Sequence, residues 1–151
     1  MDPAEVLGLP ARPPSEVEWE DLLVRLDIAP RAVRLAVEDG RGEADAEVSR
    51  ALLAAAGWEA LLQHTLDAMT RGDEVPDGFG ASWPGEESPL RALERQRRRT
   101  FALVQRRGLG VWEWRARGGL YPGASTYQLL QAAARMDART LAAIRGAGRQ
   151  G

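Results

Sequence analysis

Two carboxylates and one arginine are the residues of this chain whose types and positions could do chemistry. Glu59 and Asp137 both fall close to the apolar faces of amphipathic segments, where a carboxylate loses hydration and needs a cation or a donor. Arg97 falls near the apolar face of a third segment and is their natural partner. We expect a structural ion pair. The alternative is a polar pocket, lined by Trp58 and these three residues, that grips a small ligand.

Other catalytic chemistries have few candidates in the sequence. The chain contains no Cys, which excludes disulfides, thiolate ligands and a cysteine nucleophile, and it contains no Lys, which excludes Schiff-base chemistry. His64 is the only histidine and falls beside an apolar stripe, so we expect it at the surface or its boundary. There is no phosphate-binding loop or dinucleotide fingerprint. The sequence therefore indicates no catalytic residue, no metal site and no cofactor.

The charge is distributed unevenly along the chain. Residues 1–85 carry 17 acidic side chains and 7 Arg, whereas residues 86–151 carry 5 acidic side chains and 13 Arg. Such asymmetry can indicate nucleic-acid binding. However, the net charge is −2 and no aromatic residues alternate with the Arg run to stack on bases. We expect acidic early helices to pack beside basic late ones, and we do not expect a nucleic-acid partner.

The first 40 residues predict an arm followed by a helix. Residues 1–14 contain four prolines and predict an irregular N-terminal arm. Ser15 and Glu18 form a capping box, and apolar residues then recur at three- and four-residue spacing. Pro30 removes one backbone hydrogen bond, which predicts a kink or short break. Gly40 and Gly42 are expected to end the segment.

The second helix and the connection after it are also indicated by local signals. A near-heptad apolar stripe predicts a helix over 44–71, with Gly72 as its stop. Residues 72–88 are rich in Gly, Pro, Asp and Ser, with Phe79 and Trp83 as apolar anchors. This predicts a long connection that crosses the end of the domain.

Two further helices complete the pattern. A Ser-Pro pair at 88–89 is a strong helix start, and that helix is expected to end near Gly108. The segment that follows holds Trp112 and Trp114, which could form a short extended piece and plug one end of the domain or line a pocket.

The last helix is predicted to begin with a second capping box, formed by Ser125 and Gln128, and to close at Gly146. Together these elements predict an all-α fold, a single four-helix bundle over 15–146 followed by a short tail at 147–151.

The expected location follows from what the sequence lacks. The N-terminus has no basic region followed by an apolar run, and no stretch approaches the ~18 consecutive apolar residues of a membrane span. We therefore expect a soluble, cytoplasmic protein with no membrane partner.

Two stretches resemble the DinB-like superfamily, four-helix bundles first known as DNA-damage-inducible proteins. The stretch 49–59 (SRALLAAAGWE) resembles the family's second helix, where a histidine precedes an apolar-small-aromatic-acid run. The stretch 125–144 (STYQLLQAAARMDARTLAAI) resembles its last helix, where His-Asp-x-x-His is followed by a leucine and an isoleucine. The resemblance spans roughly residues 15–146 and implies the DinB-like fold. Its long connection lies between the predicted second helix, over 44–71, and the predicted third helix, which starts at 88–89.

The resemblance also implies that the family's metal site is lost. The three histidines that bind a divalent metal in that family correspond to Ala54, Met136 and Thr140. Alanine has no donor atom, and methionine and threonine are poor ligands for such metals. The leading hypothesis is a metal-free, non-catalytic binding or stress-associated protein that forms a homodimer and accepts at most a small apolar ligand. The alternative is a thiol-transferase-type or hydrolase-type enzyme that uses the cavity between the predicted second helix, over 44–71, and the predicted fourth helix, over 125–146.

Overall fold

The fold is all-α, as the sequence predicts. The computed structural model describes residues 1–76, 87–107 and 114–149. Their helices are α1 (Pro3–Leu7), α2 (Glu16–Asp39), α3 (Ala46–Arg71), α4 (Pro89–Arg107) and α5 (Thr126–Arg149). Within these ranges the only bridges between extended residues are two isolated ones. None of the described helices is long and apolar enough to cross a membrane.

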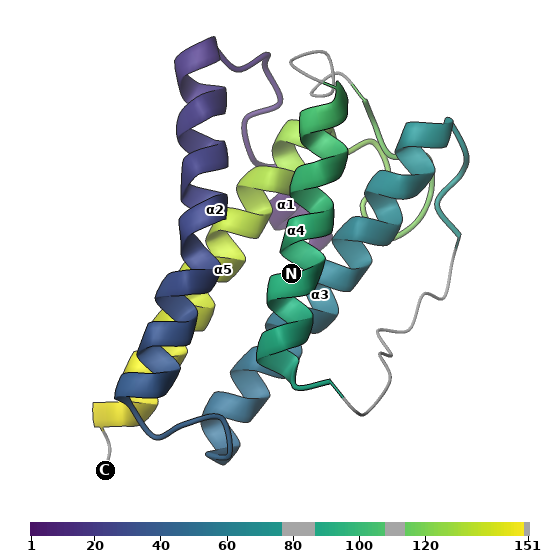
Figure 1. The fold of residues 1–151 in the computed structure, drawn as a ribbon. Helices are drawn as coiled ribbons and strands as arrows, with labels where there is room; N and C mark the ends of the chain where they lie inside the picture. Colours follow the sequence, from purple (N-terminus) through teal and green to yellow (C-terminus); the bar gives the residue numbers. More distant parts are fainter. Residues whose placement is uncertain (77–86, 108–113, 150–151) are drawn as a thin grey trace.

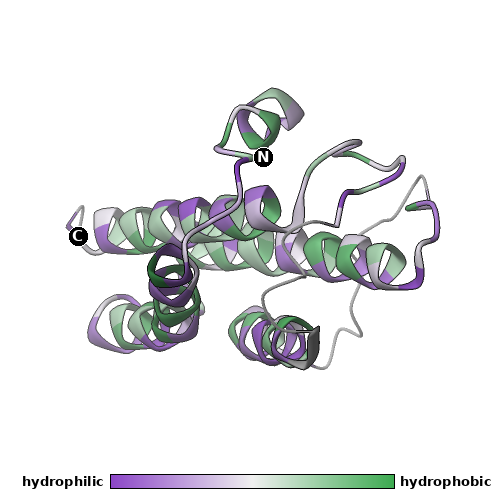
Figure 2. Ribbon diagram, turned by 90° about the horizontal axis from the view of Figure 1, so that it is seen from above, coloured by the Kyte–Doolittle hydropathy of each residue, from purple (hydrophilic) through white to green (hydrophobic). Residues whose placement is uncertain are grey.

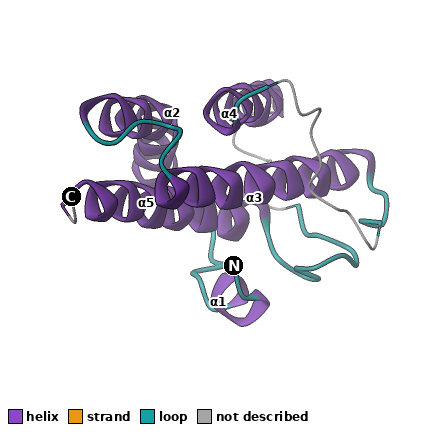
Figure 3. Cartoon of the chain, turned by 90° about the horizontal axis from the view of Figure 1, so that it is seen from below, coloured by secondary structure: helices purple, strands orange, loops and turns teal. Residues whose placement is uncertain are grey.

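The four long helices form two layers. α3 and α5 pack against each other, with α2 and α4 on one side of this pair and α1 on the other (Figures 2 and 3). α2 rests mainly on α5, and α4 rests on α3. α2 and α4 contact each other much less than either contacts the layer beneath (Figure 1). This arrangement leaves room between the two outer helices.

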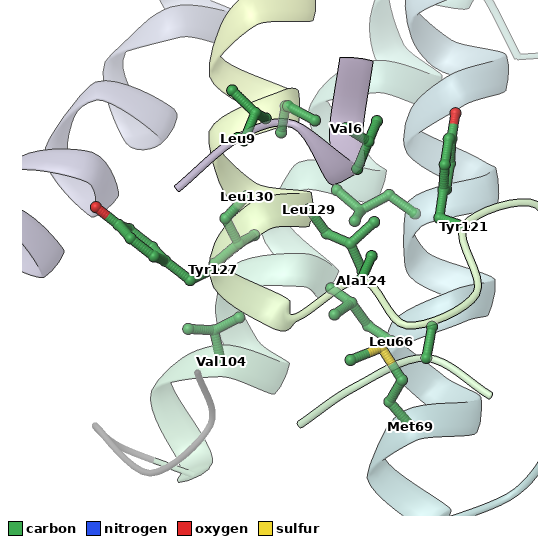
Figure 4. Packing of buried hydrophobic residues seen from close by; sticks show 14 of the residues in the cluster. Val6, Leu9, Leu66, Met69, Val104, Tyr121, Ala124, Tyr127, Leu129 and Leu130 are labelled. Carbon is green, nitrogen blue, oxygen red and sulfur yellow. The ribbon is translucent and has the colours of Figure 1, made fainter. Parts of the chain in front are cut away.

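The apolar core falls into two clusters that lie along the same four helices. One cluster joins α1 and the 114–125 segment to the long helices through Val6, Tyr121 and Leu129 (Figure 4). The other lies nearer the opposite ends and includes Val33 and Leu93. On every long helix the change from one cluster to the other occurs at the same level. A layer of charged side chains occupies that level.

The helix boundaries follow the local signals in most cases. Ser15 and Glu18 make both hydrogen bonds of a capping box, and Ser125 and Gln128 do the same. Gly72 ends α3 in the left-handed region at φ 70°, where a residue without Cβ carries no strain. These predicted boundaries are confirmed.

Two boundary predictions are wrong. Residues Pro3–Leu7 are helical, because Asp2 caps the first turn, Pro3 suits its first position and Val6 is fully buried. α5 continues past Gly146 to Arg149, because Ala147 packs into the core and outweighs the poor helix propensity of glycine.

Some of the predicted features lie outside the described residues. They are Phe79, Trp83, Gly108 and Trp112.

The first capping box carries a testable electrostatic effect. The pKa of Glu18 is lowered to about 2, chiefly because Arg12 donates hydrogen bonds to its carboxylate and also because the Ser15 amide does so. We expect Arg12→Ala to return this pKa toward 4.5, measured by NMR titration of the side-chain carboxyl carbon. Since the folded pKa lies below the unfolded one, this stabilisation is present above pH 4.5 and lost as pH falls through about 2. Arg25→Ala, a control on the same helix, should leave the Glu18 titration unchanged.

Candidate functional site

Arg97 lies at the centre of the charged layer, and all five of its N–H donors are used. Nε and Nη2 donate to the two carboxylate oxygens of Glu59, at 2.8 and 3.1 Å. Nη1 and Nη2 donate to the two carboxylate oxygens of Asp137, at 3.0 and 2.8 Å. The remaining Nη1 hydrogen goes to the Leu26 carbonyl oxygen, at 2.7 Å. A guanidinium has five donors, so Arg97 has none left for a ligand.

One side chain thus joins all four long helices. Arg97 comes from α4, Glu59 from α3, Asp137 from α5 and the Leu26 carbonyl from α2. The side chains of Arg97, Glu59 and Asp137 are 4%, 2% and 11% exposed. We name these three side chains the ion cluster. It forms the polar level that separates the two apolar clusters of the core.

The Leu26 carbonyl is available because of Pro30. In an uninterrupted helix the amide of residue 30 would donate to the carbonyl of residue 26, and proline has no amide hydrogen. α2 nevertheless continues through Pro30 from Glu16 to Asp39, and its ribbon bends midway (Figure 1). The break that was one predicted outcome is absent. Arg97 takes the place of the missing amide donor.

The ion cluster carries two carboxylates for one cation. Burial raises the pKa of Asp137, and the charge and hydrogen bonds of Arg97 only partly oppose this. Burial also lowers the pKa of Arg97, but Glu59 and Asp137 together outweigh burial and the pKa lies above its ordinary value. Arg97 therefore stays charged.

Three of the four residues that the sequence singles out come together here, and the fourth does not. Glu59, Arg97 and Asp137 form the expected ion pair network. Trp58 instead donates through Nε1 to the Tyr121 hydroxyl at 2.9 Å, and Tyr121 donates to the Met1 carbonyl at 2.8 Å. This places the Trp58 ring in the apolar cluster near α1, among residues that anchor the N-terminus.

The positions that correspond to the family's metal ligands lie in varied surroundings. Ala54 is exposed and lines a shallow groove between α3 and α5. Met136 packs against the core, and Thr140 is buried with its hydroxyl donating to the Met136 carbonyl. His64 is half-buried on α3. Among the described residues, no group of three or more His, Cys, Asp or Glu side chains is arranged to hold a metal ion.

A groove of about 640 Å³ lies between α2 and α4, and sequence reasoning missed it. Its lining combines apolar, acidic and basic side chains: Asp27, Pro30, Arg31, Arg34, Leu35, Glu94, Arg97, Arg98, Phe101, Ala102 and Gln105. We name it the α2–α4 groove. It exists because these two helices stand apart on the shared layer, and no local sequence pattern encodes that separation.

The charges of the α2–α4 groove are partly used by the protein itself. Arg34 donates from Nε to Glu94 at 2.8 Å, which links α2 to α4 across the groove. Arg97 is saturated by the ion cluster. Arg31, Arg98 and the carboxylate Asp27 are exposed and form no ion pair within the described residues. The groove therefore offers an apolar surface beside two available guanidinium groups and one carboxylate.

Comparison with known protein families, characterised proteins and solved structures found no match to this chain.

Proposed function

We propose that the chain is a metal-free four-helix bundle of the DinB-like kind that binds a small amphipathic anion in the α2–α4 groove and catalyses no reaction. The observation that carries this proposal is the saturation of the ion cluster. Arg97 has no free donor, and both oxygens of each partner carboxylate accept from it. A ligand in the interior would have to break these bonds in a buried setting, where an unpaired charge is costly.

The α2–α4 groove favours binding outside the ion cluster. Phe101, Ala102 and Pro30 supply an apolar surface, and a volume of about 640 Å³ falls within the usual range for small-molecule sites. A small ligand with an apolar body could cover this surface.

The polar residues of the groove favour a negative group on that ligand. Its lining holds four Arg and two acidic side chains, and Arg98 lacks an ion-pair partner among the described residues. A guanidinium recognises a carboxylate through paired hydrogen bonds. We therefore infer a carboxylate attached to an apolar body. This replaces the expectation of a small apolar ligand.

The test uses 4-phenylbutyrate and its uncharged counterpart 4-phenylbutan-1-ol, each titrated calorimetrically into the full chain. We expect the acid to bind at least about tenfold more tightly than the alcohol, and Arg98→Glu to remove that preference. Arg99→Glu is the matched control, since Arg99 is the exposed neighbour of Arg98 and does not line the groove. Equal affinity for acid and alcohol, or an equal loss in both variants, would overturn the proposal.

A further inference from the structure

The outer face of α2 carries a second apolar stripe that none of the described residues covers. Val17, Val24, Ile28 and Leu35 are 75%, 56%, 53% and 58% exposed. The buried residues of the same helix are centred on its opposite side. α2 also lies at the edge of the molecule (Figures 1 and 3). Scattered apolar residues on a surface need no explanation, but four in one row on one helix do.

The stripe has the spacing of a helix–helix interface. The steps between its four members are seven, four and seven residues, which matches a heptad pattern of the kind that pairs two helices. Asp21 and Arg31 occupy the two intervening heptad positions, and both are exposed. The outer stripe of α2 is therefore a row of six positions, four apolar and two of opposite charge.

The row is complementary to itself when it is read in reverse. Val17 and Leu35 are equally distant from residue 26, and so are Val24 and Ile28. The same holds for Asp21 and Arg31. Two copies of α2 that run antiparallel about residue 26 would therefore match apolar with apolar and acid with base at every position. A parallel pair would instead oppose each charge with its own kind.

We propose that two copies of this chain form a homodimer through the outer stripes of α2, packed antiparallel about a two-fold axis near residue 26. A two-fold interface needs a surface that complements itself, and the outer stripe meets that condition. Its span from Val17 to Leu35 is about 27 Å, at the rise of an α-helix. This self-complementarity favours a second copy of the chain as the partner, because binding to an unrelated helix would not require a symmetric row of residues.

The charges on the stripe are available for this pairing. Arg31 forms no ion pair with the described residues. Asp21 pairs with Arg25 on its own helix at 3.0 Å, but both side chains are more than half exposed and such pairs are weak. In the dimer, Asp21 of each copy meets Arg31 of the other. Arg31 and Leu35 also line the α2–α4 groove, whereas Val17 and Asp21 do not, so Asp21→Arg is the change that tests dimerisation apart from ligand binding.

The first experiment is sedimentation equilibrium on the full chain and three charge variants. We expect a dimer at micromolar concentration, with Asp21→Arg and Arg31→Asp each raising the dimer dissociation constant at least about tenfold. The double variant that carries both changes restores opposite charges and should return most of the affinity. Leu53→Glu, at an exposed leucine on α3, should leave the dimer unchanged. A monomeric wild type, or a double variant no better than the singles, overturns the proposal.

The second experiment fixes the orientation of the two helices. Since the chain has no Cys, any introduced thiol is the only one present. A mixture of Val17→Cys and Leu35→Cys chains should form a disulfide-linked heterodimer under mild oxidation. Val17→Cys alone should not crosslink, because its two copies would lie about 27 Å apart, well beyond disulfide reach. Efficient crosslinking of Val17→Cys alone would indicate a parallel pair and contradict the proposed interface.

Discussion

Replacing Arg97 with Met is expected to lower the free energy of unfolding by about 3 to 5 kcal/mol at pH 7, the usual result of breaking a buried ion pair. The change leaves Glu59 and Asp137 facing one another in the interior without a cation. It also leaves the Leu26 carbonyl without a donor, since Pro30 cannot supply one. Met keeps most of the apolar volume of the arginine stem. The loss in the free energy of unfolding therefore reflects the missing charge more than lost packing.

The measurement is urea unfolding followed by circular dichroism, repeated from pH 7 to pH 4. The folded pKa of Asp137 already lies above its ordinary value of 3.8 because of burial, and removing Arg97 removes the charge that opposes this rise. A carboxyl with a raised folded pKa binds its proton more tightly in the folded state. Its contribution to stability therefore falls as pH rises above 3.8 through the folded pKa. The stability deficit of Arg97→Met should shrink on acidification.

Arg98→Met is the matched control for this prediction. Arg98 is exposed and adjacent in sequence, so its replacement should change stability by no more than about 0.5 kcal/mol. A loss of under about 1 kcal/mol for Arg97→Met would contradict the assignment of Arg97 as the residue that holds the four helices together.

Replacing the whole ion cluster with apolar residues should recover most of that loss. In the triple variant Glu59→Leu, Arg97→Met and Asp137→Leu, the cluster holds no charge, and such exchanges are often neutral or stabilising. We expect stability at least about 2 kcal/mol above that of Arg97→Met alone at pH 7. The same urea unfolding experiment measures it. A triple variant as unstable as the single one would contradict a purely structural role for the cluster.

Pro30 provides a further control in the triple variant. With Met at position 97 the Leu26 carbonyl stays unpaired, at a cost of about 1 to 3 kcal/mol. Adding Pro30→Ala supplies an amide at the position that normally donates to this carbonyl, and it should stabilise the triple variant. In the wild-type background the gain should be smaller, because Arg97 already donates to Leu26. Equal gains in both backgrounds would show that Pro30 and Arg97 act independently.

The sequence determined the elements whose signals are local. Both capping boxes and the glycine stop at Gly72 each depend on residues within a few positions of one another, so they could be predicted and are confirmed. The partners of Arg97 were also predictable, because a buried carboxylate needs a cation or donor and Arg97 was the natural candidate near the apolar face of the third predicted helix.

Only the tertiary structure decided how these elements are joined and what surfaces they leave. The Leu26 carbonyl meets Arg97 across 71 residues of sequence, and the bond depends on where α2 lies against α4. Trp58 turns toward Tyr121 and the N-terminus because a helix sends neighbouring residues to different faces. The α2–α4 groove arises because both helices rest on the α3–α5 layer more closely than on each other. Such separations depend on the packing of many side chains at once, and no short stretch of sequence records them.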